Sequence, residues 1–261
     1  MGKTRVIAFS NNKGGSGKST VCGNLGYALS GLGRKVLLVD GDMQLNLSLT
    51  FFDEERVMET AQKGMTLYEC LLARRDLAGA VVHTPYENLD LVPSTILMSQ
   101  LETDLFPMMQ RELVLRKCLA PVRDSGFYDY ILIDAPPNLG IWVINILCAC
   151  DRVIIPMEAS PWGLYGLANM MEFMGKLEDI ARPELLGILI TKVNERKNYY
   201  RQTRRDLSEL EHMRTFDTVI HVDANIEWAQ EASRPVGAFK KSTRSALEFS
   251  DLAKEVEGSW Q

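Results

Sequence analysis

A glycine-rich segment between two apolar stretches constrains this chain more than any other feature. Residues 5–10 are mostly apolar and predict a short strand, whereas residues 21–32 carry apolar side chains at helical spacing. Gly33 stands where such a helix would end. Strand, glycine-rich turn and helix is the context of a phosphate-binding loop. The residues of this turn are Lys13, Gly14, Gly15, Ser16, Gly17, Lys18, Ser19 and Thr20.

The chemistry of this loop follows from its residue types. Glycines let successive backbone N–H groups point inward at an anion, and the start of the next helix adds its positive end. We expect Lys18 to pair with the β- and γ-phosphates of a nucleotide and the Ser19 hydroxyl to bind Mg²⁺. Asn12 occupies the position of the usual first glycine, and Lys13 follows it. A lone lysine there would more often be a surface residue, but in this loop we interpret Lys13 as a second phosphate-binding cation.

The segment from Lys13 to Thr20 resembles the deviant Walker A motif of the ParA/MinD family of P-loop ATPases, which includes Soj-like partition proteins. The resemblance implies that ATP and Mg²⁺ are bound and that the protein forms an ATP-dependent homodimer. In that family the first lysine reaches across the dimer interface to the nucleotide of the partner. The resemblance therefore assigns Lys13 a role in trans and Lys18 a role in its own loop, both catalytic.

Three aspartates follow apolar strands. Residues 34–40 predict a second strand that ends in Asp40, with Asp42 two residues later, and residues 128–134 predict a strand that delivers Asp134. A buried strand that ends in an aspartate is the Walker B arrangement, in which Asp134 would hold Mg²⁺ through a water. By resemblance, Asp42 positions the attacking water and Asp40 lies on the Mg²⁺ side. Met43 departs from the proline usual in the family.

The remaining pattern predicts a single fold class. Further strands are expected at 88–93, 151–156 and 185–194, and helices at 65–72, 112–119, 138–148 and 163–177. This alternation predicts an α/β, doubly wound, mainly parallel twisted sheet with helices on both faces. We expect one P-loop ATPase domain over 1–261, without an N-terminal helix-turn-helix extension. The resemblance places Asn194 beside the adenine, and His83 is interpreted as exposed in a polar loop.

The net negative charge means that any affinity for DNA must come from a local group of basic residues. The chain has 29 basic and 34 acidic residues, so the whole-chain basic character typical of nucleic-acid binding is missing. Most charge runs are solvated helix faces. In the ParA/MinD family that this chain resembles, however, dimers bind DNA without sequence preference through basic residues near the carboxyl terminus. The candidate DNA-binding residues are therefore Arg196, Lys197, Arg201, Arg204, Arg205, Lys240, Lys241 and Arg244.

The five cysteines are scattered and lack the spacing of a metal site, so we interpret them as reduced core residues. Reduced thiols favour a cytoplasmic protein, here expected on the nucleoid. No signal peptide precedes the first strand, and no apolar run reaches the length of a membrane helix.

The leading hypothesis is thus a ParA-type ATPase that partitions DNA and hydrolyses ATP slowly until a ParB-type centromere-binding partner stimulates it. A MinD-like ATPase that positions a membrane or protein cargo is the alternative, but residues 247–257 are net acidic and would be repelled by anionic lipid. A nitrogenase-iron-protein-like enzyme would need cluster ligands, for which Cys118 and Cys148 are the candidates. A DNA-binding regulator without catalysis is the fourth hypothesis.

Overall fold

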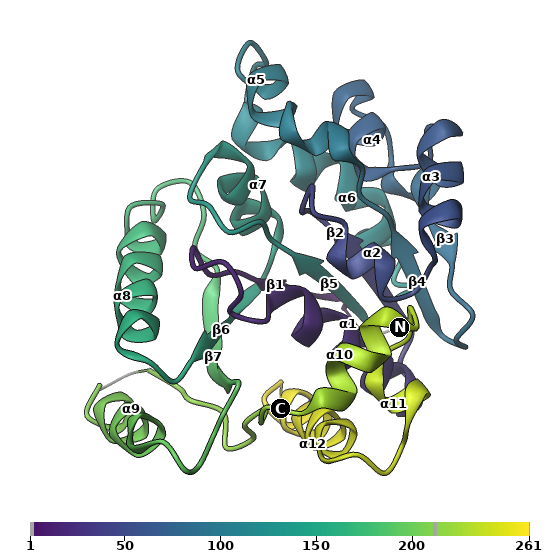
Figure 1. Ribbon diagram of the computed structural model, residues 1–261. Coiled ribbons are helices and arrows are strands. Elements are labelled where there is room, and N and C mark those ends of the chain that lie inside the picture. The colour runs from purple at the N-terminus through teal and green to yellow at the C-terminus, as the bar shows by residue number, and fades with distance from the viewer. Residues whose placement is uncertain (1–2, 211–212, 261) are drawn as a thin grey trace.

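The computed structural model describes residues 3–210 and 213–260 (Figure 1). Their strands form one sheet in the order β3-β4-β2-β5-β1-β6-β7, in which β3 is antiparallel to β4 and every other pair is parallel. The strands are β1 (Arg5–Phe9), β2 (Val36–Asp40), β3 (Val82–His83), β4 (Leu89–Val92), β5 (Tyr130–Asp134), β6 (Arg152–Glu158) and β7 (Glu184–Thr191).

Helices cover both faces of this sheet. One face packs against α1 (Lys18–Gly31), α2 (Asn46–Leu49), α3 (Glu54–Gln62), α10 (Ala224–Glu231), α11 (Val236–Phe239) and α12 (Arg244–Gly258). The other packs against α4 (Leu67–Ala73), α5 (Leu101–Leu105), α6 (Val114–Asp124), α7 (Ile141–Ala149), α8 (Pro161–Gly175) and α9 (Asn198–Ser208). The 3₁₀ turns are η1 (Leu77–Ala80), η2 (Ile96–Ser99) and η3 (Arg111–Leu113).

The central strands are apolar between their ends because both of their faces are buried. Along β1, Val6 and Ala8 pack into the core under α6, α7 and α8, whereas Ile7 and Phe9 pack into the core under α1 and α12. Successive side chains of a strand point to opposite faces, so one apolar run supplies two cores. The predicted doubly wound, mainly parallel α/β fold is confirmed.

Several predicted elements need correction. The helix expected at 112–119 begins as the 3₁₀ turn η3, and α6 starts at Val114. The loop interpretation of His83 is wrong, because His83 lies in the short edge strand β3, where Asp90 of β4 is its neighbour. Its side chain is exposed, as predicted, and its Nδ1 lies 2.7 Å from Asp90 Oδ1. Helices α2, α3 and α5 had no counterpart among the predicted elements.

The cysteines are all free, and four of the five are buried. Cys118 donates its thiol to the carbonyl oxygen of Cys70 at 3.7 Å. Burial raises the pKa of the Cys118 and Cys148 thiols to about 11, which keeps both protonated near neutral pH. These are the properties of core residues. In the part of the chain that is described, no helix is both long and apolar enough to cross a membrane.

Candidate nucleotide site

The candidate site lies where the carboxyl ends of three adjacent strands meet. Asp134 at the end of β5 is paired in register with Phe9 of β1 on one side and with Asp40 of β2 on the other. The loop that follows β1 therefore begins beside both aspartates. Ligands of open parallel sheets bind at this edge of the strands.

The loop after β1 is held by the strands on its far side. Gly15 has a φ of 73° and Gly17 a φ of 92°, which are left-handed conformations that favour glycine. Thr191 Oγ1 at the end of β7 donates a 2.9 Å hydrogen bond to the Ser16 carbonyl oxygen. Asn11 Nδ2 donates to the Pro156 carbonyl oxygen of β6 at 2.7 Å. These bonds hold the loop against the ends of β6 and β7.

Lys18, the first residue of α1, is the buried cation of the site. Its side chain is buried, and its Nζ lies 3.5 Å from the Lys13 carbonyl oxygen. Burial lowers the pKa of Lys18, whereas the charges of Asp134 and Asp42 oppose that fall. The ammonium group therefore depends on anionic neighbours, and a triphosphate would supply more of them.

Lys13, the predicted trans lysine, contacts its own subunit. Its Nζ lies 3.2 Å from Glu158 Oε2 at the end of β6 and 3.3 Å from Ser160 Oγ. The side chains of Lys13 and Glu158 are 29% and 38% exposed, so this ion pair is partly solvated. To reach a second subunit, Lys13 has to leave both contacts.

The two strand-end aspartates differ in how they are satisfied. Asp40 Oδ2 accepts hydrogen bonds from Ser48 N at 2.8 Å and Ser48 Oγ at 2.6 Å, and Asp40 Oδ1 accepts one from Asp42 N at 3.2 Å. Burial raises the pKa of Asp40 to about 6, although the Ser48 bonds oppose that rise. Within the described residues, both Asp134 carboxylate oxygens are buried without a hydrogen-bond partner.

Asp134 is consequently the carboxylate that needs a cation. Burial raises its pKa well above the usual value, the Asp40 charge adds to the rise, and Ser19 and Lys18 oppose it. A buried polar group without a partner costs free energy unless a ligand satisfies it. Mg²⁺ at nucleotide sites takes one or two protein oxygens and completes its shell with phosphate and water. The residues present fit that requirement, with the Ser19 hydroxyl as a donor and the Asp134 carboxylate able to hold the ion through a water.

A cavity of about 550 Å³ opens in front of the loop. Its lining contains Gly14, Gly15, Gly17, Lys18, Ser19, Thr20 and Asp42 from the predicted site. Lys13, Ser16, Asp40, Asp134 and Asn194 do not line it. Asp42 is nearly buried, and its Oδ1 accepts the Gln44 N–H at 3.1 Å. This bond holds the carboxylate at the cavity wall.

The far wall of the cavity comes from residues that the sequence did not single out. Lys192 brings a further lysine near the loop, with its Nζ 3.9 Å from the position a Cβ on Gly15 would take. Residues 220–223, Ile226 and Gln230 complete the wall, and Gln230 Nε2 donates to Thr20 Oγ1 at 3.1 Å. Asn194 instead accepts the backbone N–H of Arg196 at 3.1 Å. Residues 220–223 and Ile226 therefore line this part of the cavity and Asn194 does not, so the contact of Asn194 with an adenine stays a prediction.

The candidate DNA-binding residues come from two segments that meet. Arg201, Arg204 and Arg205 lie exposed on α9, with Arg196 and Lys197 in the loop before it. Lys240 and Lys241 are exposed just before α12, which begins at Arg244. Arg244 Nη2 lies 3.1 Å from Glu195 Oε1, which joins the two segments. Its Nε also donates to Glu248 at 2.8 Å, so Arg244 is neutralised within the subunit.

His221 connects this junction to the cavity. It lines the cavity, and its Nδ1 lies 2.6 Å from Glu248 Oε1. Its Nε2 lies 2.6 Å from Arg244 Nη2 and 3.0 Å from Glu195 Oε1. One cluster of side chains therefore extends from the nucleotide cavity to the basic segments.

Comparison with known proteins extends these observations over the whole chain. Residues 4–186 match the AAA domain family. The sporulation initiation inhibitor protein Soj of Bacillus subtilis is 34% identical over 258 residues, covering 98% of each chain. The chromosome partitioning protein ParA of Caulobacter vibrioides is 31% identical over 254 residues, covering 97% of this chain and 93% of its own.

A solved structure shares the fold. The cobyrinic acid a,c-diamide synthase of Mycobacterium smegmatis, with bound ATP analog and magnesium, superposes with a TM-score of 0.82 at 27% identity. The match covers 98% of this chain and 96% of that one. Together with the loop and the strand-end aspartates, these similarities show that the chain belongs to the ParA family of partition ATPases.

Proposed function

We propose that this protein hydrolyses ATP with Mg²⁺ in the cavity at the carboxyl edge of the sheet. The observation that carries the proposal is the grouping of buried Lys18 and Asp134 around a glycine-rich loop, with both Asp134 carboxylate oxygens lacking a hydrogen-bond partner in the described residues. Loop N–H groups and Lys18 would bind the β- and γ-phosphates, and Asp42 would orient the attacking water. Asp134 and Ser19 would hold Mg²⁺, which neutralises phosphate charge when bound.

We further propose that ATP drives dimerisation through Lys13. In the single subunit Lys13 is paired with Glu158, so its transfer to a neighbour's phosphates exchanges one ion pair for another. That exchange favours the dimer only when the anion offered is more attractive than one partly solvated carboxylate. A γ-phosphate supplies that difference, and its hydrolysis removes it.

The dimer would bind DNA without sequence preference. Two copies of the basic segments around α9 and α12 provide twice the phosphate contacts of one, which raises affinity steeply and makes it salt-dependent. A ParB-type partner would stimulate hydrolysis and release the DNA. We therefore propose a cytoplasmic, nucleoid-bound protein that segregates DNA.

Two lysine variants test the mechanism. Lys18→Ala should lose nucleotide binding by about 100-fold or more, since the buried phosphate ligand is gone. Lys13→Ala should still bind ATP but lose nucleotide-dependent dimerisation and hydrolysis. Fluorescent-nucleotide titration, light scattering with a slowly hydrolysed ATP analogue, and phosphate release measure the three steps.

Lys176→Ala, at the residue that follows α8, is the matched control, because Lys176 also pairs with a glutamate of its own subunit but its side chain is exposed. It should behave as the unmodified protein. Normal hydrolysis and dimerisation by Lys13→Ala would refute the role in trans while leaving the ATPase assignment intact.

The DNA step has its own test. The double change Arg204→Gln and Arg205→Gln should reduce the affinity of the ATP-bound dimer for a random-sequence duplex, and also the slope of its salt dependence by about one per lost contact. Unchanged affinity and slope would remove α9 from the interface. Vesicle pelleting with anionic lipid distinguishes the MinD-like alternative, which requires ATP-dependent lipid binding.

A further inference from the structure

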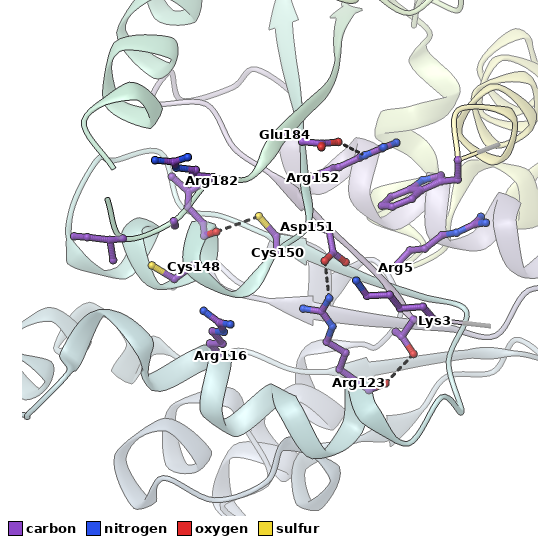
Figure 2. Close-up of a pocket in the computed structure, with 15 residues that line it drawn as sticks. Lys3, Arg5, Arg116, Arg123, Cys148, Cys150, Asp151, Arg152, Arg182 and Glu184 are labelled. Atoms are coloured by element: carbon purple, nitrogen blue, oxygen red, sulfur yellow. Dashed lines mark hydrogen bonds and ion pairs between the residues drawn. The ribbon is translucent and has the colours of Figure 1, made fainter. Parts of the chain in front are cut away.

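A second charged cleft lies at the opposite edge of the sheet. It encloses about 620 Å³ and is built from the amino ends of β1, β6 and β7, the helix α6, and the chain around Arg182 and Trp260 (Figure 2). Its lining carries six cationic and two acidic side chains, a formal surplus of four positive charges in a chain whose net charge is −5. The cations are Lys3, Arg5, Arg116, Arg123, Arg152 and Arg182.

The two acidic side chains neutralise only two of these cations. Arg123 Nη2 donates to Asp151 Oδ1 at 2.6 Å, and Arg152 Nε donates to Glu184 Oε2 at 3.0 Å (Figure 2). Among the residues that the structure describes, Lys3, Arg116 and Arg182 form no ion pair with a carboxylate. Arg116 extends from α6 on one side of the cleft, and Arg182 lies on the other (Figure 2).

Compensation of helix ends does not account for this surplus. In a parallel α/β fold, α6 and α7 end at the amino edge of the sheet, where cations offset the negative ends of helices. Arg123 lies in the last turn of α6 and serves that purpose. Arg116 lies in the first turns of the same helix, Lys3 precedes β1, and Arg182 lies in the chain between α8 and β7. Arg182 Nε donates to the Glu178 carbonyl oxygen at 2.8 Å in the turns after α8, whereas Lys3 and Arg116 are not explained by helix ends.

Trp260 gives the cleft a fixed wall. The Arg152 guanidinium lies 4.1 Å from the Trp260 ring centroid, and the Arg5 guanidinium lies 5.2 Å from it. The indole therefore packs against two arginines, which limits their movement. Within the described part of the chain, the buried Trp260 Nε1–H has no acceptor. The wall thus combines an aromatic ring with the positive charge of two arginines.

We propose that this cleft is a binding site for a small oligophosphate, such as the phosphate chain of a nucleotide. Five of its six cations are arginines, whose planar donor groups match phosphate oxygens in pairs. Its volume falls within the range of small-ligand pockets. A concave cleft of this size admits a phosphate chain more readily than the convex backbone of a DNA duplex.

The site is separate from the ATPase cavity. Its lining shares no residue with the lining of the carboxyl-edge cavity. Strands β1 and β6, however, contribute to both ends, because Arg5 and Arg152 begin the strands that lead to the phosphate loop and to Glu158. Binding of an anion here is thus independent of the ATPase proposal and survives its failure.

Calorimetric titration with inorganic tripolyphosphate tests the proposal. The full chain is first saturated with ADP at constant free Mg²⁺, so that the phosphate loop is filled, and the titration is repeated with Lys18→Ala. Saturable binding is expected in both proteins. The double change Arg116→Gln and Arg182→Gln should raise the tripolyphosphate Kd by about 100-fold, roughly tenfold for each guanidinium.

The matched control is Arg74→Gln with Arg75→Gln, which removes the same charge from two exposed arginines after α4, outside the cleft, and should change the Kd by less than twofold. The single changes Arg116→Lys and Arg182→Lys keep the charge, and their tripolyphosphate Kd should lie between those of the unmodified protein and the double variant. They also test the site if the double variant folds poorly. Absence of tripolyphosphate binding, or equal weakening by the control, would overturn the proposal. So would loss of oligonucleotide binding alone in the Arg116 and Arg182 variant.

Discussion

The two edges of the sheet carry excess charge of opposite sign. At the carboxyl edge, Asp40, Asp42 and Asp134 are buried beside one buried lysine, so negative charge is left over. At the amino edge, six cations face two carboxylates, so positive charge is left over. The same strands lead from one edge to the other. The difference indicates that the carboxyl edge awaits a cation together with a polyphosphate, and the amino edge an anion alone.

The largest test of this contrast is Asp134→Asn. Removing a buried charge without a hydrogen-bond partner should stabilise the nucleotide-free protein by about 1–3 kcal/mol, measured by urea unfolding. The same change should lower ATP hydrolysis by about 100-fold or more, since the proposed Mg²⁺ site would lose the carboxylate that holds the ion through a water.

Asp40→Asn is the matched control for that stability gain. Its carboxylate already accepts three hydrogen bonds, two of them from Ser48. An amide there would place N–H groups against donors, so destabilisation is expected. Stabilisation by both changes would mean that the hydrogen bonds of Asp40 do not distinguish it from Asp134.

Thr191→Val tests the carboxyl edge separately, because it removes a hydrogen bond that holds only the phosphate loop. The variant loses the 2.9 Å bond to the Ser16 carbonyl oxygen but keeps the shape of a buried side chain. We expect ATP affinity to fall about tenfold and stability to fall by about 1 kcal/mol. Tripolyphosphate binding at the amino edge should remain the same, and its loss would show that the two edges are coupled.

Glu158→Gln removes the ion pair that holds Lys13 in its own subunit. Partly exposed pairs contribute up to about 1 kcal/mol, so ATP-dependent dimerisation should strengthen by about three- to fivefold in sedimentation velocity. Glu172→Gln on α8, which breaks the exposed pair with Lys176, is the matched control and should have no effect. Weaker dimerisation in Glu158→Gln would show that Glu158 helps rather than restrains Lys13.

The smallest effect is expected from Arg123→Gln at the amino edge. It breaks the 2.6 Å pair with Asp151, but Asp151 still accepts the Val6 N–H at 2.9 Å. A loss of about 1 kcal/mol in stability and no change in ATP hydrolysis are expected. A large fall in hydrolysis would link the amino edge to catalysis.

The contrast also shows which features a sequence can reveal. The phosphate loop, Asp42 and Asp134 were predictable because consecutive residues with strong preferences surround them, and the central strands are continuous apolar runs. Residues 46–130 form short elements such as α2, α5 and the two-residue β3, whose patterns are too brief for a periodicity to register.

The residues that sequence reasoning missed are single side chains brought together by the fold. Lys192 and His221 lie in different segments of the chain, and the fold brings both to the wall of the cavity. The amino-edge cations stand alone in the sequence, from Lys3 to Arg182, and each reads as an ordinary surface charge. No local pattern marks them, because strand order and not sequence distance makes them neighbours.

Gly41 shows how tightly the strands pack at the carboxyl edge of the sheet. A Cβ at this position would lie 2.6 Å from the Asp134 carbonyl oxygen, which itself accepts the Gly41 N–H at 3.0 Å, and the Gly41 carbonyl accepts the indole N–H of Trp142 at 2.8 Å. Any residue with a Cβ at position 41, between Asp40 and Asp42, would therefore require β2 and β5 to move apart. Laboratory evolution of new activities at this edge should therefore never fix a substitution at position 41, whereas exposed Met43, two residues on, is open to variation.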